Sequence, residues 1–247
     1  MPMKSFGLTD VGKVRHENQD SYIIEDCKKR NCIVTVICDG MGGAKAGDLA
    51  SRLSSKAFVS RVYEALISPS LFIGNIENLL RESCADANAS VFEYSSFEPD
   101  YKGMGTTLVG GVIYRRKACL VNVGDSRAYH LDEFGITQIT RDHSYVEELI
   151  RMGAITKEEA RTHPKKNIIT RALGIDSAVE CDYFEVPLRK GEGILLCSDG
   201  LSNMVTDNEI YSVFLKENSP DKVCCALKDL AMERGARDNI SVVFVKI

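Results

Sequence analysis

The sequence predicts an α+β fold in which two antiparallel β-sheets pack together and helices cover both outer faces. Short runs rich in Val, Ile and Leu are bounded by Gly, Asp or Asn, as β-strands are. These runs come in consecutive groups rather than alternating one by one with helices, which favours antiparallel sheets. Two long stretches with apolar residues at three- and four-residue steps supply helices for the outside.

The expected strands follow one another along most of the chain. Each is a short apolar run that begins or ends near a glycine, an aspartate or an asparagine, which marks a turn. The runs are 21–25, 32–38, 106–114, 118–123, 128–131, 194–197 and 240–247.

The expected helices divide into a long pair and a later, shorter set. The long pair covers about 47–67 and 76–94, from the spacing of its apolar residues. Thr156 and Thr206 are each followed three residues later by a glutamate, Glu159 and Glu209, which predicts two capping boxes. A further helix is expected over about 221–233.

Composition narrows the class of protein. The chain has 247 residues, 44 % hydrophobic and 27 % charged, and no linker divides it, so we expect one domain over 1–247. The net charge is −4 and the basic residues are not clustered, which argues against a nucleic-acid partner. No apolar run approaches the ~18 residues of a membrane span. Nine cysteines without metal-binding spacing, and no secretory leader, predict a cytoplasmic protein.

Five aspartates stand at the ends of predicted strands. Asp39, Asp125 and Asp199 each close an apolar run beside a glycine, whereas Asp20 and Asp238 each precede one. Strands that end at an aspartate and strands that start from one can be antiparallel neighbours. We therefore expect the five carboxylates to gather at one edge of the sheets.

Such a cluster needs compensating positive charge, because neighbouring carboxylates repel one another. Mg²⁺ and Mn²⁺ prefer oxygen ligands, and two such ions can promote an in-line displacement at phosphorus. Gly40 is expected to make a tight turn that brings its carbonyl to a metal. Arg15, five residues before Asp20, carries a planar guanidinium suited to phosphate.

Each of these functional interpretations has a purely structural alternative. An Asp-Gly pair usually makes only a turn, and an arginine such as Arg15 is most often a solvated surface charge. His143 is more often a hydrogen-bonded structural residue than a catalyst, and His163, before a proline, is expected to order a turn.

Taken together, the motifs resemble the type 2C, or PPM, family of metal-dependent Ser/Thr protein phosphatases, in its bacterial branch. They fall in the family's order and span nearly the whole chain. The matching segments are RHENQD (15–20), DGMGG (39–43), GTT (105–107), VGDSR (123–127), RDHS (141–144), SDGL (198–201) and RDNIS (237–241). The segment 144–174 resembles the flap of the bacterial branch. The family's four-layer α-β-β-α sandwich agrees with the pattern of elements.

The resemblance implies two core Mn²⁺ or Mg²⁺ ions bridged by Asp39. It places the Gly40 carbonyl on one ion and Asp199 and Asp238 on the other, with Asp20 acting through bound water. A third, weaker metal site would use Asp125 with Asp199.

Two further roles follow from the same resemblance. Arg15 would bind the substrate phosphate, and Thr162, in the flap, is a candidate to approach the third metal site.

Two positions depart from the family. Gln19 stands where some relatives have glutamate, and Met41 stands where animal members carry a histidine proposed as general acid. The proton for the leaving oxygen must therefore come from water or another group.

The hypothesis is a one-step hydrolysis of phosphoserine and phosphothreonine in proteins by a water that bridges the two metals. The expected partners are phosphoproteins, including a Ser/Thr kinase and its targets, and the enzyme is expected to be a monomer. Two alternatives stay open. One is a two-metal phosphodiesterase or nuclease, and the other is a pseudophosphatase that binds phosphoproteins without turnover.

Overall fold

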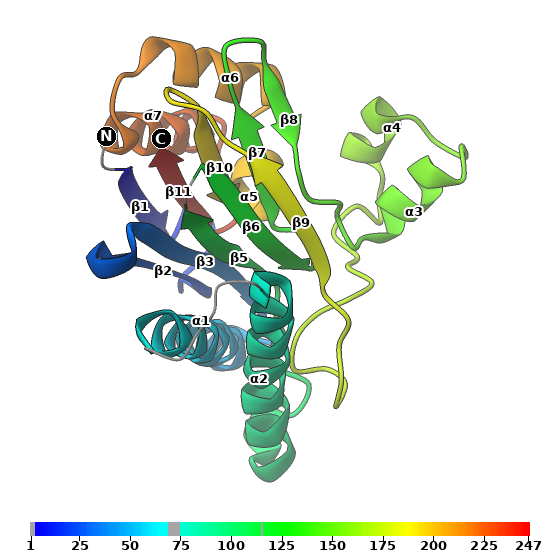
Figure 1. The fold of residues 1–247 in the computed structure, drawn as a ribbon. Helices are drawn as coiled ribbons and strands as arrows, with labels where there is room; N and C mark the ends of the chain where they lie inside the picture. The colour runs from blue at the N-terminus through cyan, green and yellow to red at the C-terminus, as the bar shows by residue number, and fades with distance from the viewer. Residues whose placement is uncertain (1–2, 69–74, 115) are drawn as a thin grey trace.

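Two antiparallel β-sheets form the centre of the molecule (Figure 1). The computed structural model describes residues 3–68, 75–114 and 116–247, with the backbone alone at 44 and 45. The first sheet contains, in spatial order, β1 (Lys4–Asp10), β11 (Ile240–Lys246), β10 (Gly193–Cys197), β7 (Arg127–Leu131) and β8 (Ile136–Gln138). The second contains β2 (Asp20–Cys27), β3 (Cys32–Met41), β5 (Leu108–Tyr114), β6 (Lys117–Val123) and β9 (Asp182–Pro187), and β4 (Gly105–Thr106) pairs with the end of β3.

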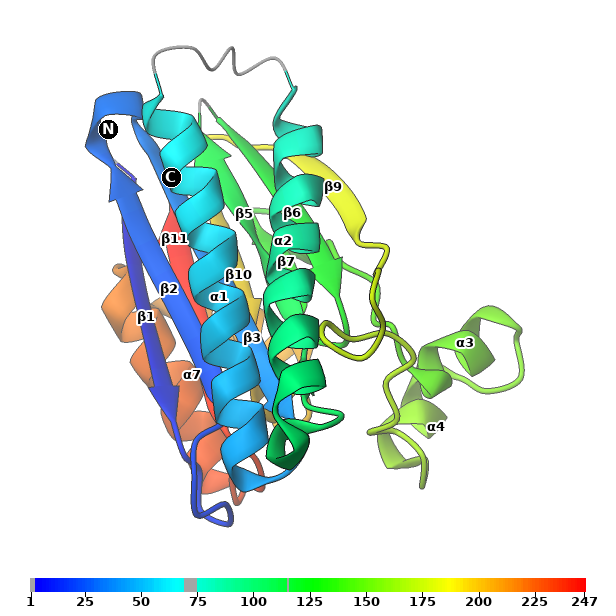
Figure 2. The ribbon, with the colours of Figure 1, turned by 90° about the horizontal axis from the view of Figure 1, so that it is seen from below.

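Helices cover the outer face of each sheet, which completes four layers (Figures 1 and 2). On the second sheet lie α1 (Ala44–Ile67) and α2 (Ile76–Phe97), side by side in Figure 2. On the first sheet lie α6 (Asp207–Lys216) and α7 (Pro220–Glu233). Short helices fill three connections: η1 (Lys28–Arg30), η3 (Pro99–Tyr101) and α5 (Asp199–Ser202).

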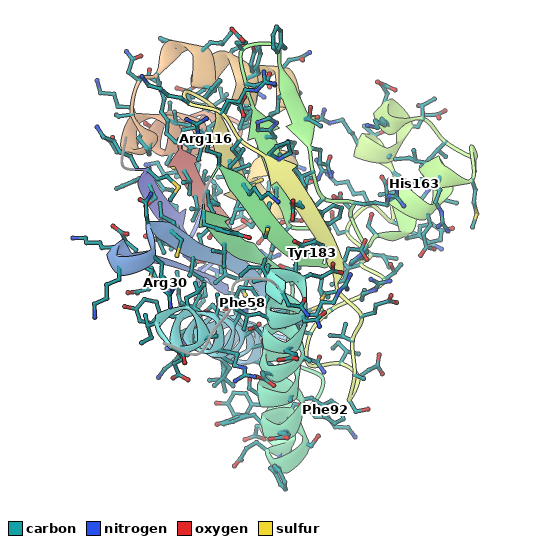
Figure 3. All side chains as sticks on the ribbon, in the orientation of Figure 1. Arg30, Phe58, Phe92, Arg116, His163 and Tyr183 are labelled. Carbon is teal, nitrogen blue, oxygen red and sulfur yellow. The ribbon has the colours of Figure 1, made fainter. Side chains whose placement is uncertain are left out.

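Three layers of apolar side chains hold these four layers together. Phe58 of α1, labelled in Figure 3, is fully buried between the helices and the second sheet. Ile37 and Leu196 belong to the layer between the two sheets. Leu227 and Phe244 belong to the layer between the first sheet and its helices. Because both faces of each sheet are covered, the central strands are nearly continuous apolar runs.

The predicted four-layer sandwich is confirmed, and the predicted strands lie where expected, within a few residues. The structure adds three strands that the sequence pattern did not predict: β1, β8 and β9. All three lie at sheet edges and are partly exposed, so their sequences mix polar and apolar residues. The run 106–114 is also split, since Thr107 separates β4 from β5.

The tight turn expected at Gly40 is corrected by the structure. Gly40 lies inside β3 rather than in a turn, and a Cβ atom there would lie 2.0 Å from the carbonyl oxygen of Gly47. The glycine is needed because α1 starts against the strand at this point. The turn itself is made by Gly42 and Gly43, whose φ angles are 119° and 91°.

The flap segment projects from one side of the sandwich (Figure 1). It contains α3 (Tyr145–Arg151) and α4 (Lys157–Thr162), and His163 lies in it, apart from the sheets (Figure 3). An isolated bridge from Ser144 to Ile169 joins the two ends of the segment to each other, and a second, from Thr106 to Leu173, ties its far end to the body of the protein.

No helix among the described residues is long and apolar enough to cross a membrane. That the whole chain is a single domain, with a flap subdomain at about 144–174, stays a prediction.

Candidate active site

The five aspartates singled out in the sequence come together at one end of the sandwich. Asp20 and Asp39 are direct partners in the antiparallel pair of β2 and β3. A cavity of about 540 Å³ is lined by Asp39, Asp125, Asp199 and Asp238. Asp20 is buried at 7 % exposure next to these residues, and its carboxylate interacts with those of Asp199 and Asp238.

Strand connections explain why these side chains converge. Asp125 follows β6, Asp199 begins α5 directly after β10, and Asp238 lies two residues before β11. Since β10 and β11 run antiparallel, the end of one lies beside the start of the other. The convergence expected from the sequence is therefore present.

The backbone of Asp39 is held by two threonines of the GTT motif. Thr106 Oγ1 and the Thr107 amide donate to the Asp39 carbonyl at 2.9 and 2.8 Å. The Asp39 amide donates to Thr107 Oγ1 at 3.0 Å, and that hydroxyl pairs with Ser126 Oγ at 2.7 Å. These bonds fix the position from which the carboxylate enters the cavity.

Asp20 is held by serines of the other sheet. Ser198 Oγ donates to Asp20 Oδ2 at 2.8 Å and accepts from the Ser241 amide at 3.0 Å. Burial raises the pKa of Asp20 to about 7, and the hydrogen bonds from Ser241 and Ser198 act against that rise.

Asn239 joins the strand end to the loop that carries Arg15. Its Oδ1 accepts from the Gln19 amide at 2.9 Å, and its Nδ2 donates to the carbonyls of Val11 and Glu17 at 2.9 and 3.0 Å. One side chain next to Asp238 therefore sets the path of residues 11–19. The sequence motif RDNIS contains Asn239, but its spacing along the chain gives no sign of this role.

Arg15 lies at the rim of the cavity. Its Nη2 donates to Asp238 Oδ2 at 2.8 Å, and its side chain is 52 % exposed. The hydrogen bond to Asp238 raises the pKa of Arg15, and the nearby charges of Asp39 and Asp199 act in the same direction. The guanidinium is thus placed where an anion in the cavity can meet it.

The surroundings of the carboxylates at this site raise their pKa values and so disfavour full ionisation of the cluster. Burial, followed by the charge of Asp238, raises the pKa of Asp199 to about 6. Burial likewise raises the pKa values of Asp39 and Asp125 well above their usual range, with added repulsion from Asp20 and Asp199 respectively. Two unit charges 4 Å apart repel by about 4 kcal/mol at an effective dielectric constant of about 20.

These donors fit divalent cations. Buried oxygens Asp20 Oδ1 and Asp199 Oδ1 have no hydrogen-bond partner within the described part of the chain. Such orphaned carboxylate oxygens are costly unless a proton or a cation compensates them. The five convergent aspartates offer only oxygen atoms, which suits Mg²⁺ or Mn²⁺ rather than zinc.

The flap contributes to the cavity through residues other than the one predicted. Asn167 and Ile169 line it, whereas Thr162 does not and instead donates its hydroxyl to the Glu159 carbonyl at 3.4 Å. Thr162 sits at the end of α4, further out along the flap, so its proposed approach to a third metal site has no support in this geometry.

His143 and His163 have the structural roles expected of them. His143 Nδ1 accepts from the Gly124 amide at 3.1 Å, and its Nε2 lies 3.3 Å from Asp182 Oδ2, so it supports the turn before Asp125. Burial, followed by the charge of Arg171, lowers the pKa of His143. The Lys165 amide donates to His163 Nδ1 at 3.1 Å, which orders a turn.

Gln19, Met41 and His16 also line the cavity. Gln19 is neutral, and its Nε2 donates to the Gly43 carbonyl at 2.7 Å, so it supports the turn before α1. Met41 has no proton to donate. His16 was not singled out from the sequence, although it adjoins Arg15 in the first motif. It is the one imidazole among the described residues that line the cavity.

Comparison with known proteins gives a consistent result. The family model described as protein phosphatase 2C matches residues 13–221. The serine/threonine phosphatase stp of Listeria welshimeri is 39 % identical over 238 residues, which is 96 % of this chain and 93 % of that protein.

Solved structures agree with this match. The crystal structure of the serine/threonine phosphatase Stp1 from Staphylococcus aureus superposes with a TM-score of 0.92 at 38 % identity, covering all of this chain and 96 % of the other. The catalytic domain of the phosphatase PstP, solved in complex with two manganese ions, gives a TM-score of 0.86 at 33 % identity, covering 99 % and 97 % of the two chains.

Proposed function

The chain belongs to the protein phosphatase 2C family, and we propose that it is a metal-dependent phosphatase that hydrolyses phosphoserine and phosphothreonine in proteins. One observation supports this most directly. Carboxylates from five segments, separated by up to 218 positions between Asp20 and Asp238, come together: four line one cavity with Arg15 at its rim, and Asp20 is buried beside them.

The proposed cation site uses this cluster. Asp39 would bridge two Mn²⁺ or Mg²⁺ ions, with the Gly40 carbonyl on one and Asp199 and Asp238 on the other. Asp20 would act through water, and Asp125 with Asp199 would serve a third, weaker position. Such ions, when bound, supply an activated water and positive charge for in-line displacement at phosphorus.

The chain's own groups bind and orient the phosphoryl group. Arg15 offers a forked pair of N–H donors, which suits two phosphoryl oxygens at once. Its guanidinium lies at the rim of the cavity, and the hydrogen bonds of Asn239 hold the loop on which it stands. The substrate phosphate therefore meets a cation whose position is already set.

The leaving serine or threonine oxygen needs a proton. Met41 cannot supply it, and His143 does not line the cavity. The cavity is open to solvent, so the proton comes from water or from His16 at its wall.

The finer assignments rest on the family and on the cysteines. The substrates proposed are phosphoproteins that include a Ser/Thr protein kinase and its targets, and the enzyme is proposed to act as a monomer. All nine cysteines are free thiols, and eight of them are buried, which is consistent with a reducing compartment such as the cytoplasm.

The test is phosphate release from a phosphothreonine peptide with and without Mn²⁺, for the wild type and for Asp39→Asn and Asp199→Asn. Each substitution removes a charge from the cation site, so we expect losses of at least a hundredfold. Asp229→Asn, on the outer surface of α7, is the matched control and should keep full activity. Activity that persists in EDTA would refute the proposal, and faster cleavage of a phosphodiester would favour the nuclease alternative.

A further inference from the structure

A second hollow opens beside the catalytic cavity. Its volume is about 520 Å³, within the range of ligand sites, and it lies between the β1–β2 loop, the start of α1 and the end of α2. Figure 2 shows these three segments at the same end of the sandwich. We call it the tyrosine hollow, after Tyr94 and Tyr101. Its other lining residues are Glu17, Asn18, Asp48, Leu49 and Arg52.

The charges in the tyrosine hollow leave a negative balance. Arg52 Nη2 lies 3.0 Å from Asp48 Oδ2, one turn earlier on α1, so these two charges compensate each other. Glu17 is exposed, and its carboxylate forms no ion pair with any described residue. An incoming cation thus finds one unpaired carboxylate, whereas an incoming anion finds an arginine that is already paired.

The two tyrosines add a second element of cation recognition. Their rings meet edge to face, with centroids 5.4 Å apart and planes at 84°. Tyr94 is 38 % exposed, while Tyr101 packs against the buried cluster that contains Met104. A cation above the face of an aromatic ring is attracted by the negative charge density of that face.

The wall beside Glu17 is held in place before any ligand arrives. Asn18 Nδ2 donates to Thr9 Oγ1 at 2.9 Å, and Asn18 Oδ1 accepts from the Asp20 amide at 3.1 Å. The carbonyl of Glu17 accepts from Asn239. Loss of loop freedom on binding is therefore small, which favours affinity.

Glu17 lines both the tyrosine hollow and the catalytic cavity, so the two adjoin at this residue. We propose that the tyrosine hollow binds a lysine or arginine side chain that flanks the phosphorylated residue of a protein substrate. This inference rests on the proposed phosphatase function, because it places the phosphoresidue in the catalytic cavity. Because the two hollows adjoin at Glu17, the basic side chain belongs close in sequence to the phosphorylated residue.

The test uses phosphothreonine peptides in an alanine background, with one arginine moved from four residues before the phosphate to four residues after it. The wild-type enzyme should hydrolyse the peptide with arginine at its best position roughly three- to tenfold faster, as kcat/KM, than the all-alanine peptide. A glutamate at that position should give no gain.

Variants then locate the preference. The measured quantity is the ratio of kcat/KM for the arginine peptide to that for the alanine peptide, so a general change in activity cancels. Tyr94→Ala and Glu17→Gln should each bring this ratio towards one, whereas Tyr94→Phe should keep it, because the ring remains. Phe97→Ala is the matched control, since Phe97 is an exposed aromatic residue three positions further along α2 and is not part of the hollow.

Three results would overturn the proposal. They are equal rates for arginine and alanine peptides at every position, a preference for glutamate, or a preference for arginine that survives both Tyr94→Ala and Glu17→Gln. Each of these requires a wild-type enzyme that hydrolyses phosphopeptides. A wild type that hydrolyses none of them overturns the phosphatase function itself, so the two failures are distinct.

Discussion

The Arg15 guanidinium can pair with either of two anions, the Asp238 carboxylate or the substrate phosphate. In the structure its guanidinium is paired with Asp238, a proposed cation ligand, at 2.8 Å. A divalent ion at Asp238 would compete for that carboxylate and leave the guanidinium available to phosphate. The same residue thus links the state of the cation site to the binding of substrate.

At this scale we predict that Arg15→Ala lowers kcat/KM roughly ten- to a hundredfold, mainly by raising KM. Hydrogen bonds to a charged group contribute about 1.5–3 kcal/mol, which sets this range. The kcat/KM of Arg15→Lys should fall between that of Arg15→Ala and that of the wild type, because lysine keeps the charge but loses the planar fork. Steady-state kinetics on a phosphothreonine peptide measure both.

Arg189→Ala is the control, since Arg189 is an exposed arginine in the β9–β10 connection and its side chain has no part in the cavity. If Arg15→Ala left KM unchanged, the guanidinium would not be a phosphate ligand.

Two helices begin with the same capping box, although they stabilise different parts of the molecule. In α4 the Thr156 amide donates to Glu159 at 2.7 Å, and in α6 the Thr206 amide donates to Glu209 at 2.9 Å. Helix α6 buries Ile210 and Phe214 against the first sheet. Helix α4, in the flap, buries only Ala160.

We therefore predict that replacing the N-cap threonine by alanine lowers global stability in α6 but not in α4. Thr206→Ala should lower the free energy of unfolding by about 1 kcal/mol, the usual cost of a lost N-cap. Thr156→Ala should leave global stability within about 0.3 kcal/mol, because α4 can open without the rest of the protein. Urea denaturation measures the first effect, and faster proteolytic cleavage within the flap measures the second. Equal losses of global stability would mean that the flap unfolds together with the body.

The acidic cluster makes the stability of the whole molecule depend on pH and metal. Without a cation, burial holds the pKa of Asp20 near 7 and that of Asp199 near 6, above the ordinary value of 3.8. Between pH 3.8 and about 7 the folded state then binds more protons than the unfolded state. Stability from this source is complete below about pH 4 and is lost as the pH rises through 6 and 7.

We predict that the thermal midpoint in EDTA falls as the pH is raised from 5.5 to 7.5, relative to Asp39→Asn and Asp199→Asn variants. Mn²⁺ displaces the protons, so the midpoint gained on adding it should be larger at pH 7.5 than at pH 5.5. Differential scanning calorimetry measures both, and a single transition would support one domain over 1–247. A midpoint that ignores EDTA at every pH would contradict the claimed proximity of the acids.

Local signals in the sequence determined much of this molecule. The central strands, the two long helices and both capping boxes depend on residues within a few positions of one another, so their patterns are visible along the chain. The edge strands β1, β8 and β9 were missed because half-exposed strands lack a continuous apolar run. The convergence of Asp20, Asp39, Asp125, Asp199 and Asp238 followed from strand ends and antiparallel pairing, while the individual roles proposed for these residues come from resemblance to a family.

Tertiary structure alone decided the contacts between distant segments. Asn239 meets Gln19 and Glu17 across more than 200 residues, and Ser198 reaches Asp20 from the other sheet. The flap presents Asn167 and Ile169 to the cavity instead of Thr162. The tyrosine hollow exists only because the end of α2 packs beside the β1–β2 loop. Such pairings depend on how layers of the sandwich stack, and no periodicity along the chain records which side chains then face each other.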